Sequence, residues 1–452
     1  MLAGLSNYLN LVWYQDYVDS LGASHREVFY MHSTDEGSTW GQEVRLSTED
    51  NKTSVLPVIA AFGTNVHVVW NDYGIGTMYR RSTDYGVTWD SIDTLLGNDL
   101  TFGNSIAAVG DSVYVIGNAP SQHWQVYTWS TDQGRSWTQY RIISYRQSQR
   151  LPLSVHIPFL HIAKDPLDST AGTLKTYYLR STDGGRNWGR DTLISDTDSA
   201  GSQAPALTVD YRGNPHVTWY DYRYSPYPWT GDIFYTLSRD SGTAWISPDS
   251  LTVVHRAVRS SILAQGDTLH LVWDDDRNGF DTNFEMYYRI STDLGVNWSS
   301  EVRLTLAPGV SIFPCLGQTL NYVHLVWVDE RDDTLAHWRD IYYKRKFKAS
   351  GVPSQEISDR QRQRGVFLRI LPNPTRGGCV LQVEGEVVKE VHVYNVQGCL
   401  IKTLTSDASR LAPFALRWDG RDEQRKEVKS GIYFVRVKTD RCSVTQKLIL
   451  MR

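Results

Sequence analysis

An eight-residue pattern, Ser-x-Asp-x-Gly-x-x-Trp, occurs six times along this chain at a nearly even spacing of roughly 50 residues. A period of about 40–50 residues with strand-like sequence between the copies is typical of the blades of a β-propeller. The spacing constrains the fold more than the activity, because it repeats a structural unit and not a reactive group. The six copies are Ser33, Asp35, Gly37 and Trp40; Ser82, Asp84, Gly86 and Trp89; Ser130, Asp132, Gly134 and Trp137; Ser181, Asp183, Gly185 and Trp188; Ser238, Asp240, Gly242 and Trp245; and Ser291, Asp293, Gly295 and Trp298.

Each copy, called a box below, follows an alternating run rich in aromatic residues, such as MYYRIS (286–291). Alternation of this kind predicts a β-strand. The box itself predicts a hairpin turn, because Asp can accept hydrogen bonds from backbone amides and Gly allows a positive φ. The Trp is expected to begin the next strand and to pack back across its own hairpin. All four box residues are therefore interpreted as structural.

A second pattern precedes most boxes, as in HVVWND (67–72) and HLVWDDDR (270–277), with weaker versions at 114–117 and 161–164. It defines seven units, each with four expected strands: strand A (as in 56–63), strand B, strand C, the box, and strand D. The seventh unit continues to DIYYKRK (340–346) and has no box. Seven blades are favoured and six are the alternative. The histidines that recur in strand B are expected to serve packing; they are His67, His161, His216, His270 and His324.

Composition and charge restrict the class of protein. Hydrophobic residues make up 41% and charged residues 21% of the chain, which suits a soluble globular protein. No apolar run approaches the roughly 18 residues of a membrane helix. Residues 351–452 carry 18 Lys and Arg against 11 Asp and Glu, and the rest of the chain carries 28 against 39. An acidic propeller argues against a broad nucleic-acid surface.

The first residues, MLAGLSNYLNLVWYQD, show neither a basic region nor a long apolar core, so no signal peptide is predicted. They resemble the middle of a blade strand, and a truncated or misassigned start is the favoured interpretation.

The four cysteines are Cys315, Cys379, Cys399 and Cys442, and none forms a Cys-x-x-Cys pair. This spacing argues against a zinc site, and at most one disulfide is expected in the C-terminal region. The run Asp274-Asp275-Asp276 is interpreted as a solvated loop, with calcium binding as the alternative. No metal and no cofactor are expected.

The C-terminal hundred residues change character. Residues 347–364 are polar and predict a linker, and residues 365–452 contain seven short strand patterns that predict a small β-sandwich. Several motifs in this segment resemble the C-terminal sorting domain of type IX secretion cargo, whose Ig-like pattern also occurs in the flagellar hook-capping protein. The resemblance implies that the type IX machinery exports the chain to the surface of a Gram-negative bacterium or into the medium. The motifs are Pro372-Asn373-Pro374, VYNVQG (393–398), Trp418-Asp419-Gly420, SGIYF (430–434) and the closing KLILMR.

The boxes resemble the Asp-box, or BNR, repeats of the sialidase-like superfamily, over residues 1–346. The resemblance implies a ligand face opposite the boxes. Sialidase chemistry would need three arginines on the substrate carboxylate, a Tyr–Glu nucleophile pair and an Asp acid/base. The early Phe/Tyr-Arg-Ile-Pro motif is missing, and Tyr140-Arg141-Ile142-Ile143 is a poor match. No catalytic residue can be assigned, and an ordinary glycosidase pair of carboxylates cannot be chosen either.

One further constellation is Trp-x-Asp-x-Arg, which recurs with Arg223, Arg277 and Arg331 in three units. Because strands alternate in direction, the loop between strands B and C leaves the blade opposite the box. These arginines are expected to brace their loops by pairing with Asp221, Asp275 and Asp329. The alternative is that they bind a carboxylate or sulfate.

Three functions follow from these observations. The preferred one is an exported or surface propeller that binds a glycan or a protein without catalysis. The alternatives are a diverged exo-acting glycosidase of the sialidase type, and a structural or adhesive surface protein. The expected fold is an all-β, sialidase-like propeller followed by a small Ig-like sandwich, with neither a nucleic-acid partner nor a transmembrane segment.

Overall fold

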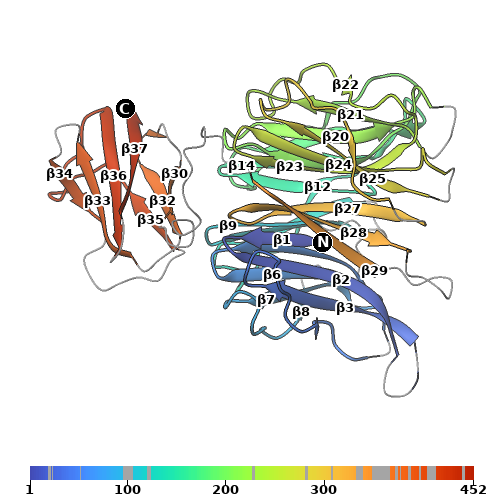
Figure 1. Ribbon diagram of the computed structural model, residues 1–452, viewed down its shortest axis with the longest axis horizontal. Coiled ribbons are helices and arrows are strands. Elements are labelled where there is room, and N and C mark those ends of the chain that lie inside the picture. Colours follow the sequence, from blue (N-terminus) through green and yellow to red (C-terminus); the bar gives the residue numbers. More distant parts are fainter. Residues whose placement is uncertain are drawn as a thin grey trace. The chain divides into compact units, whose positions relative to one another are not determined.

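The computed structural model describes residues 1–18, 22, 24–50, 52–94, 105–119, 124–225, 230–279, 283–306, 309–331, 340–348, 367–371, 375–376, 378–384, 388–395, 399–404, 414–439 and 443–451. These residues form strands and turns without a helix (Figure 1). None of them therefore belongs to a helix that is long and apolar enough to cross a membrane. The chain forms two compact units, Met1–Lys348 and Ala349–Arg452. Residues 349–364 of the predicted linker lie outside the described residues.

The first unit consists of successive antiparallel sheets. The first three are β1–β4 (Leu2–Leu5, Tyr8–Val18, Ser24–Ser33, Val44–Arg45), β5–β8 (Ser54–Phe62, Asn65–Asp72, Gly76–Ser82, Asp93–Thr94) and β9–β12 (Ser105–Val109, Ser112–Ala119, Trp124–Ser130, Arg141–Ser144). The others are β13, β14, β17 and β18 (Leu153–His156, Phe159–Lys164, Tyr177–Ser181, Thr192–Leu193), β19–β22 (Ser202–Val209, Pro215–Asp221, Asp232–Leu237, Asp249–Ser250), β23–β26 (Ala257–Gln265, Thr268–Asp275, Glu285–Ser291, Val302–Arg303) and β27–β29 (Ser311–Gln318, Tyr322–Asp329, Asp340–Phe347). A small hairpin, β15–β16 (Leu167–Asp168, Thr173–Leu174), follows β14.

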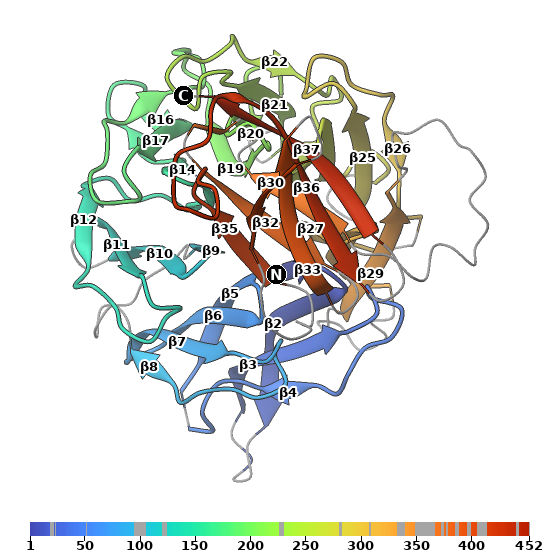
Figure 2. The same cartoon turned by 90° about the vertical axis from the view of Figure 1, so that its left-hand side faces the viewer.

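These sheets surround a common axis and are called blades 1 to 7 in chain order, with strands A to D numbered outward from the axis. Their first strands contact one another in the cyclic order β1, β5, β9, β13, β19, β23, β27 and back to β1. Figure 2 shows the sheets radiating around this centre, from blue β1–β4 through green β20 to yellow β25. Such an arrangement of blades, four-stranded except for the three-stranded blade 7, is a β-propeller, because each blade buries its faces against two neighbours.

The boxes form the turns between strands C and D. In blade 4, the Ser181 hydroxyl accepts a hydrogen bond from the Gly185 amide (2.8 Å) and donates one to the Asp183 carboxylate (2.8 Å). Asp183 accepts a further bond from the Asn187 amide (2.9 Å). The bond from the Asn187 amide contributes most to lowering the pKa of Asp183, and together these bonds hold it at about 2. The box is therefore a turn that a single carboxylate organises.

The box Trp also packs against the preceding blade, a contact that the sequence pattern did not predict. Trp188 lies edge-on against Tyr127 of the preceding blade, with ring centroids 5.1 Å apart. The other box Trp residues make the same contact: Trp89 with Tyr30, Trp137 with Tyr79, Trp245 with Tyr178, Trp298 with Tyr235, and Trp40 with Tyr343. The box Gly lies against the same Tyr hydroxyl. The boxes thus join blades as well as turning the chain.

The recurring histidines bond to strand C tyrosines in blades 2, 4, 5, 6 and 7. His216 Nδ1 shares a 2.7 Å hydrogen bond with the Tyr235 hydroxyl. Burial lowers the pKa of His67 and His324 to about 3, so the rings are neutral and act in packing. The other pairs are His67 with Tyr79, His161 with Tyr178, His270 with Tyr288, and His324 with Tyr343.

Blade 7 meets blade 1 through side chains and loops. Trp40 packs on Tyr343 at 5.4 Å, and Arg345 donates to the Glu36 carbonyl at 2.7 Å. The Asn321 amide donates to the Glu36 carboxylate at 2.7 Å. Blade 7 has no box, and Lys346 lies 4.8 Å above the Tyr288 ring, where the other blades place a Trp. Blade 7 therefore contacts blade 1, just as each earlier blade contacts the next one.

We expect Asp183→Asn to lower the free energy of unfolding by about 1 kcal/mol at neutral pH, because the turn loses a charged acceptor. The pKa of this carboxyl is lower in the folded chain than its ordinary 3.8. Its stabilisation is therefore present above about pH 4 and is lost as the pH falls towards 2. Urea unfolding at pH 7 and pH 2.5 checks this, and the difference between variant and wild type should shrink at the lower pH. An equal difference at both values would contradict it.

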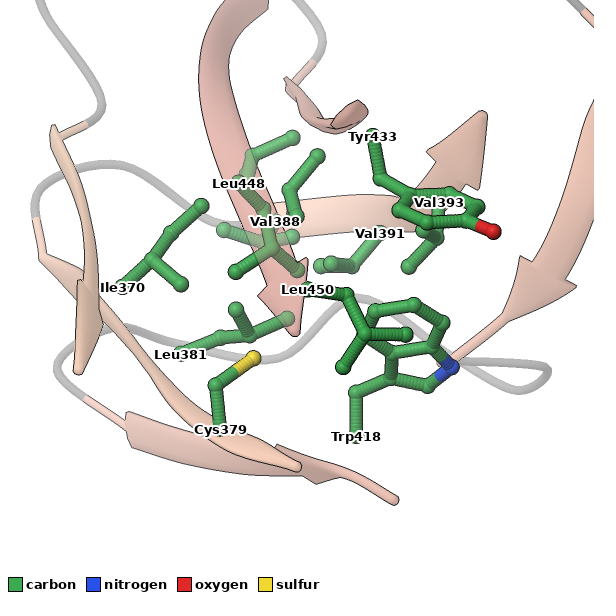
Figure 3. Close-up of a cluster of buried hydrophobic side chains, with 12 residues drawn as sticks. Ile370, Cys379, Leu381, Val388, Val391, Val393, Trp418, Tyr433, Leu448 and Leu450 are labelled. Atoms are coloured by element: carbon green, nitrogen blue, oxygen red, sulfur yellow. The ribbon is translucent and has the colours of Figure 1, made fainter. Parts of the chain in front are cut away.

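The second unit is a two-sheet sandwich. One sheet contains β30, β32 and β35 (Phe367–Leu371, Cys379–Glu384, Phe414–Trp418). The other contains β31, β37, β36, β33 and β34 (Thr375–Arg376, Ser443–Met451, Gly431–Thr439, Val388–Asn395, Leu400–Thr403). Trp418, Tyr433 and Leu450 meet between the sheets in one buried cluster, which Figure 3 shows. Cys315, Cys379 and Cys399 are free thiols; Cys442 and Pro372–Pro374 lie outside the described residues.

Candidate functional site

The two ends of the propeller are distinguished by their connections. The Glu36 amide of the first box donates to the carbonyl of Asn7, in the turn between strands A and B (2.9 Å). Boxes and A–B turns therefore share one end, called the box end. Because antiparallel strands alternate in direction, the B–C loops and the D–A connections share the other, called the loop end.

Arg223, Arg277 and Arg331 lie at the loop end, beside strand C of their own blades. Arg277 donates to the Asp275 carboxylate from Nε (2.9 Å) and Nη2 (2.5 Å), and its guanidinium lies 4.1 Å from the Tyr287 ring centre. Arg223 pairs in the same way with Asp221 over Phe234, and Arg331 with Asp329 over Tyr342. The three aromatic rings belong to strand C, the third strand from the axis. The guanidinium N–H groups of these arginines donate to carboxylates of their own blades. The geometry is that of a loop brace.

A different set of residues surrounds the axis at this end. Strand A is bulged in blades 2, 5, 6 and 7, where the register with strand B shifts by one residue. Three bulges place Leu56, Ala204 and Phe313 at φ of 54°, 49° and 58°. A proline follows each of them, and proline cannot donate to the ladder, which suits a bulge. The recurring x-Pro in strand A was a sequence signal for this site, and sequence reasoning missed it.

Two buried carboxylates hold the bulges in place. Asp165 at the end of strand B in blade 4 accepts from the Arg150 amide (3.1 Å) and from the Ala204 amide in blade 5 (2.9 Å). Asp274 in blade 6 accepts from the Arg259 amide (2.8 Å) and from the Phe313 amide in blade 7 (3.2 Å). Each carboxylate thus ties its own blade to strand A of the next.

The expectation of a solvated loop at Asp274-Asp275-Asp276 is wrong. The three residues are 0%, 0% and 1% exposed. Asp274 bonds to the bulge amides and Asp275 to Arg277, while Asp276 lies 3.6 Å from the Arg256 guanidinium. Burial raises the pKa of Asp274, and the nearby Arg259 opposes this. Within the described residues, no group of three or more His, Cys, Asp or Glu side chains is placed to hold a metal ion.

The bulge carboxylates bind the backbone amides of two arginines from different blades, Arg150 in blade 4 and Arg259 in blade 6. The Arg259 guanidinium stands 4.2 Å above the Phe313 ring, with Nε 3.0 Å from Asp274. Burial lowers the pKa of Arg150, and the positive charge of Arg259 lowers it further. Two like charges held together in a partly desolvated place repel each other, and an anion bound between them would relieve that repulsion. The arrangement is suited to an anionic ligand.

Two tyrosines complete the cluster. The Tyr222 hydroxyl donates to the Tyr220 hydroxyl (3.2 Å), which donates to the amide oxygen of Gln203 (3.0 Å). Burial raises the pKa of both phenols, so they are neutral hydrogen-bond donors at neutral pH. An amide oxygen cannot remove a phenol proton, so Gln203 cannot act as a base towards Tyr220. We call Arg150, Arg259, Tyr220, Gln203 and Phe313 the arginine cluster.

The comparisons with known proteins assign the C-terminal unit and the fold of the first. The family model described as "Secretion system C-terminal sorting domain" matches residues 369–451. No curated protein matches the chain in sequence. An ulvan lyase of the polysaccharide lyase class, solved with a GlcA-containing saccharide bound, is similar in structure with a TM-score of 0.51 and 10% identity, over 76% of this chain and 90% of its own.

Two further structures align at lower scores. A protein of unknown function from Dyadobacter fermentans aligns with a TM-score of 0.46 and 11% identity, over 76% of this chain and 93% of its own. PorZ, a surface component of the type IX secretion system of Porphyromonas gingivalis, aligns with a TM-score of 0.46 and 12% identity, over 100% of this chain and 59% of its own. At these identities the likeness concerns the fold alone.

Proposed function

We propose that this chain, whose last residues form a secretion system C-terminal sorting domain and whose first unit has a sialidase-like propeller fold, binds an acidic glycan at its loop end without hydrolysing it. The sorting domain makes the chain an export substrate of the type IX machinery. Once outside, the propeller would present the arginine cluster to surface or extracellular polysaccharides.

The observation that carries the proposal is the Arg259 guanidinium at the loop end, which stands over the Phe313 ring beside the buried Asp274. A guanidinium group recognises carboxylate or sulfate, because its planar fork matches both anions. Phe313 beside Arg259 adds an exposed apolar ring, 44% exposed, which suits the apolar face of a sugar. The ulvan lyase that shares the fold is bound to a saccharide that contains GlcA, an acidic sugar.

Two features favour binding over hydrolysis. The Tyr220 phenol donates to the amide oxygen of Gln203, which cannot act as a base. Both Asp165 and Asp274 use both of their oxygens on backbone amides, so neither carboxylate is free to move a proton at a glycosidic oxygen. The exo-acting glycosidase is the alternative, and a surface protein without a small ligand is the third candidate.

We expect Arg259→Ala to weaken binding of acidic glycans by about tenfold or more, because a charged hydrogen bond contributes roughly 1.5–3 kcal/mol. Neutral glycans should bind the variant and the wild type equally weakly. A glycan array followed by calorimetry on the full chain measures this. Arg212→Ala, an exposed arginine at the box end, is the matched control and should change nothing.

The same experiment separates the alternatives. Equal binding of acidic and neutral glycans by the wild type, or unchanged binding by Arg259→Ala, would refute the arginine cluster as the site. Turnover of a fluorogenic sialoside by the wild type, lost in Arg259→Ala, would replace binding with the glycosidase function. Absence of any glycan binding would favour the structural surface protein.

A further inference from the structure

The loop end carries a second aromatic surface beside the arginine cluster, on the B–C loop of blade 5. Its described member is Tyr224, which is 59% exposed. Its ring stacks on Phe234 with centroids 6.2 Å apart and lies 6.4 Å from the His255 ring. One side of the tyrosine is thus supported while most of the side chain faces solvent.

The base of this loop is held by one backbone carbonyl. The His255 oxygen accepts bonds from the hydroxyls of Thr230 (3.0 Å) and Ser225 (3.4 Å), which stand at the two ends of the loop. His255 itself adopts a φ of 58° and is fixed by the buried Asp232, which accepts from its amide (3.0 Å) and from Nδ1 (2.6 Å). Side chains fixed in this way are pre-organised, which lowers the entropy lost on binding.

The distance along the chain places this surface close to the arginine cluster. His255 precedes Arg259 of β23 by four residues, which span at most about 13 Å. Phe313 lies directly under the Arg259 guanidinium at 4.2 Å. Arg259 lies in β23 of blade 6, between blade 5, which carries Tyr224, and blade 7, which carries Phe313. Both rings are exposed, and exposed aromatic rings suit the apolar faces of sugars.

We propose that the loop end takes an internal stretch of an acidic polysaccharide, with Tyr224 and Phe313 stacking on sugars that flank the one held by Arg150 and Arg259. This inference rests on the proposed function and specifies its ligand as a chain of at least three sugars. A site for a terminal sugar alone would need only the arginine cluster.

The test uses the full chain and size-defined oligogalacturonates and heparin fragments of two, four and six sugars, titrated by calorimetry. For whichever of the two kinds of oligosaccharide binds, we expect affinity to rise about tenfold from two sugars to six. Tyr224→Ala should abolish this rise and leave disaccharide affinity unchanged, while Tyr224→Phe should retain it. Phe313→Ala should weaken every length. Tyr211→Ala, an exposed tyrosine at the box end (48%), is the control and should behave as wild type.

Two outcomes would overturn the inference. One is equal affinity for all lengths, which would mean a pocket for a single sugar and would leave the proposed function intact. The other is an undiminished rise in Tyr224→Ala when its thermal melting matches the wild type. Failure of the wild type to bind any acidic oligosaccharide would instead refute the proposed function itself.

Discussion

Replacing Gly185 with alanine is expected to lower the free energy of unfolding of the propeller by about 3 kcal/mol. Gly185 has a φ of 86°, and a Cβ atom at this position would overlap the hydroxyl of Tyr127 in the preceding blade. The substitution therefore adds a steric clash between two blades to the ordinary cost of a positive φ. Urea unfolding of the full chain, followed by tryptophan fluorescence, measures the change.

The neighbouring residue supplies the matched control. Gly184 also has a positive φ (73°), but its Cβ atom would meet nothing within 4 Å. Five other boxes place a non-glycine residue at this position with φ between 57° and 65°. We therefore expect Gly184→Ala to cost about 1 kcal/mol or less. Similar losses for the two variants would mean that the contact between blades contributes little.

A second variant tests the steric cause directly. The Tyr127 hydroxyl has no hydrogen-bond partner in the part of the chain that the structure describes, so Tyr127→Phe should cost little. In the Gly185→Ala background, the same change removes the overlapping oxygen and should recover part of the lost stability. A double variant no more stable than Gly185→Ala alone would argue against the clash.

Deleting residues 365–452 is expected to abolish delivery to the cell surface. The deletion removes the segment that matches the sorting domain, 369–451, and leaves the compact unit Met1–Lys348. With an inner-membrane leader attached, the truncated chain should accumulate in the periplasm of a host that has the type IX machinery. Cell fractionation and surface proteolysis locate the protein.

Two controls make this result specific. The purified propeller should keep the cooperative unfolding and the glycan affinity of the full chain, which separates failed export from failed folding. Residues 365–452 fused to a neutral reporter should carry it to the surface. Surface delivery of the truncated protein would contradict the role of the sorting domain.

The sequence determined the repeat, and with it the blade pattern and the box turn. A box is local: Ser181, Asp183, Gly185 and Asn187 satisfy one another within a few residues, so their spacing alone predicts the turn. The C-terminal motifs likewise indicated a sandwich and a sorting domain, which the family model confirms. Of the four strands expected per blade, strand D proved to be only two residues long in most blades.

Only the tertiary structure decided what lies between the blades. The sequence repeat shows which positions are equivalent in successive blades. It does not show which residues of a neighbouring blade they contact, so the contact of Trp188 with Tyr127 of another blade was missed. The arginine cluster depends on the same kind of contact: the Asp274 carboxylate reaches amides in two blades and thereby sets the register of both bulges. Hydrogen bonds between residues so distant in the chain carry no local sequence periodicity. The ring of blades alone brings the Arg259 guanidinium over the Phe313 ring of the next blade.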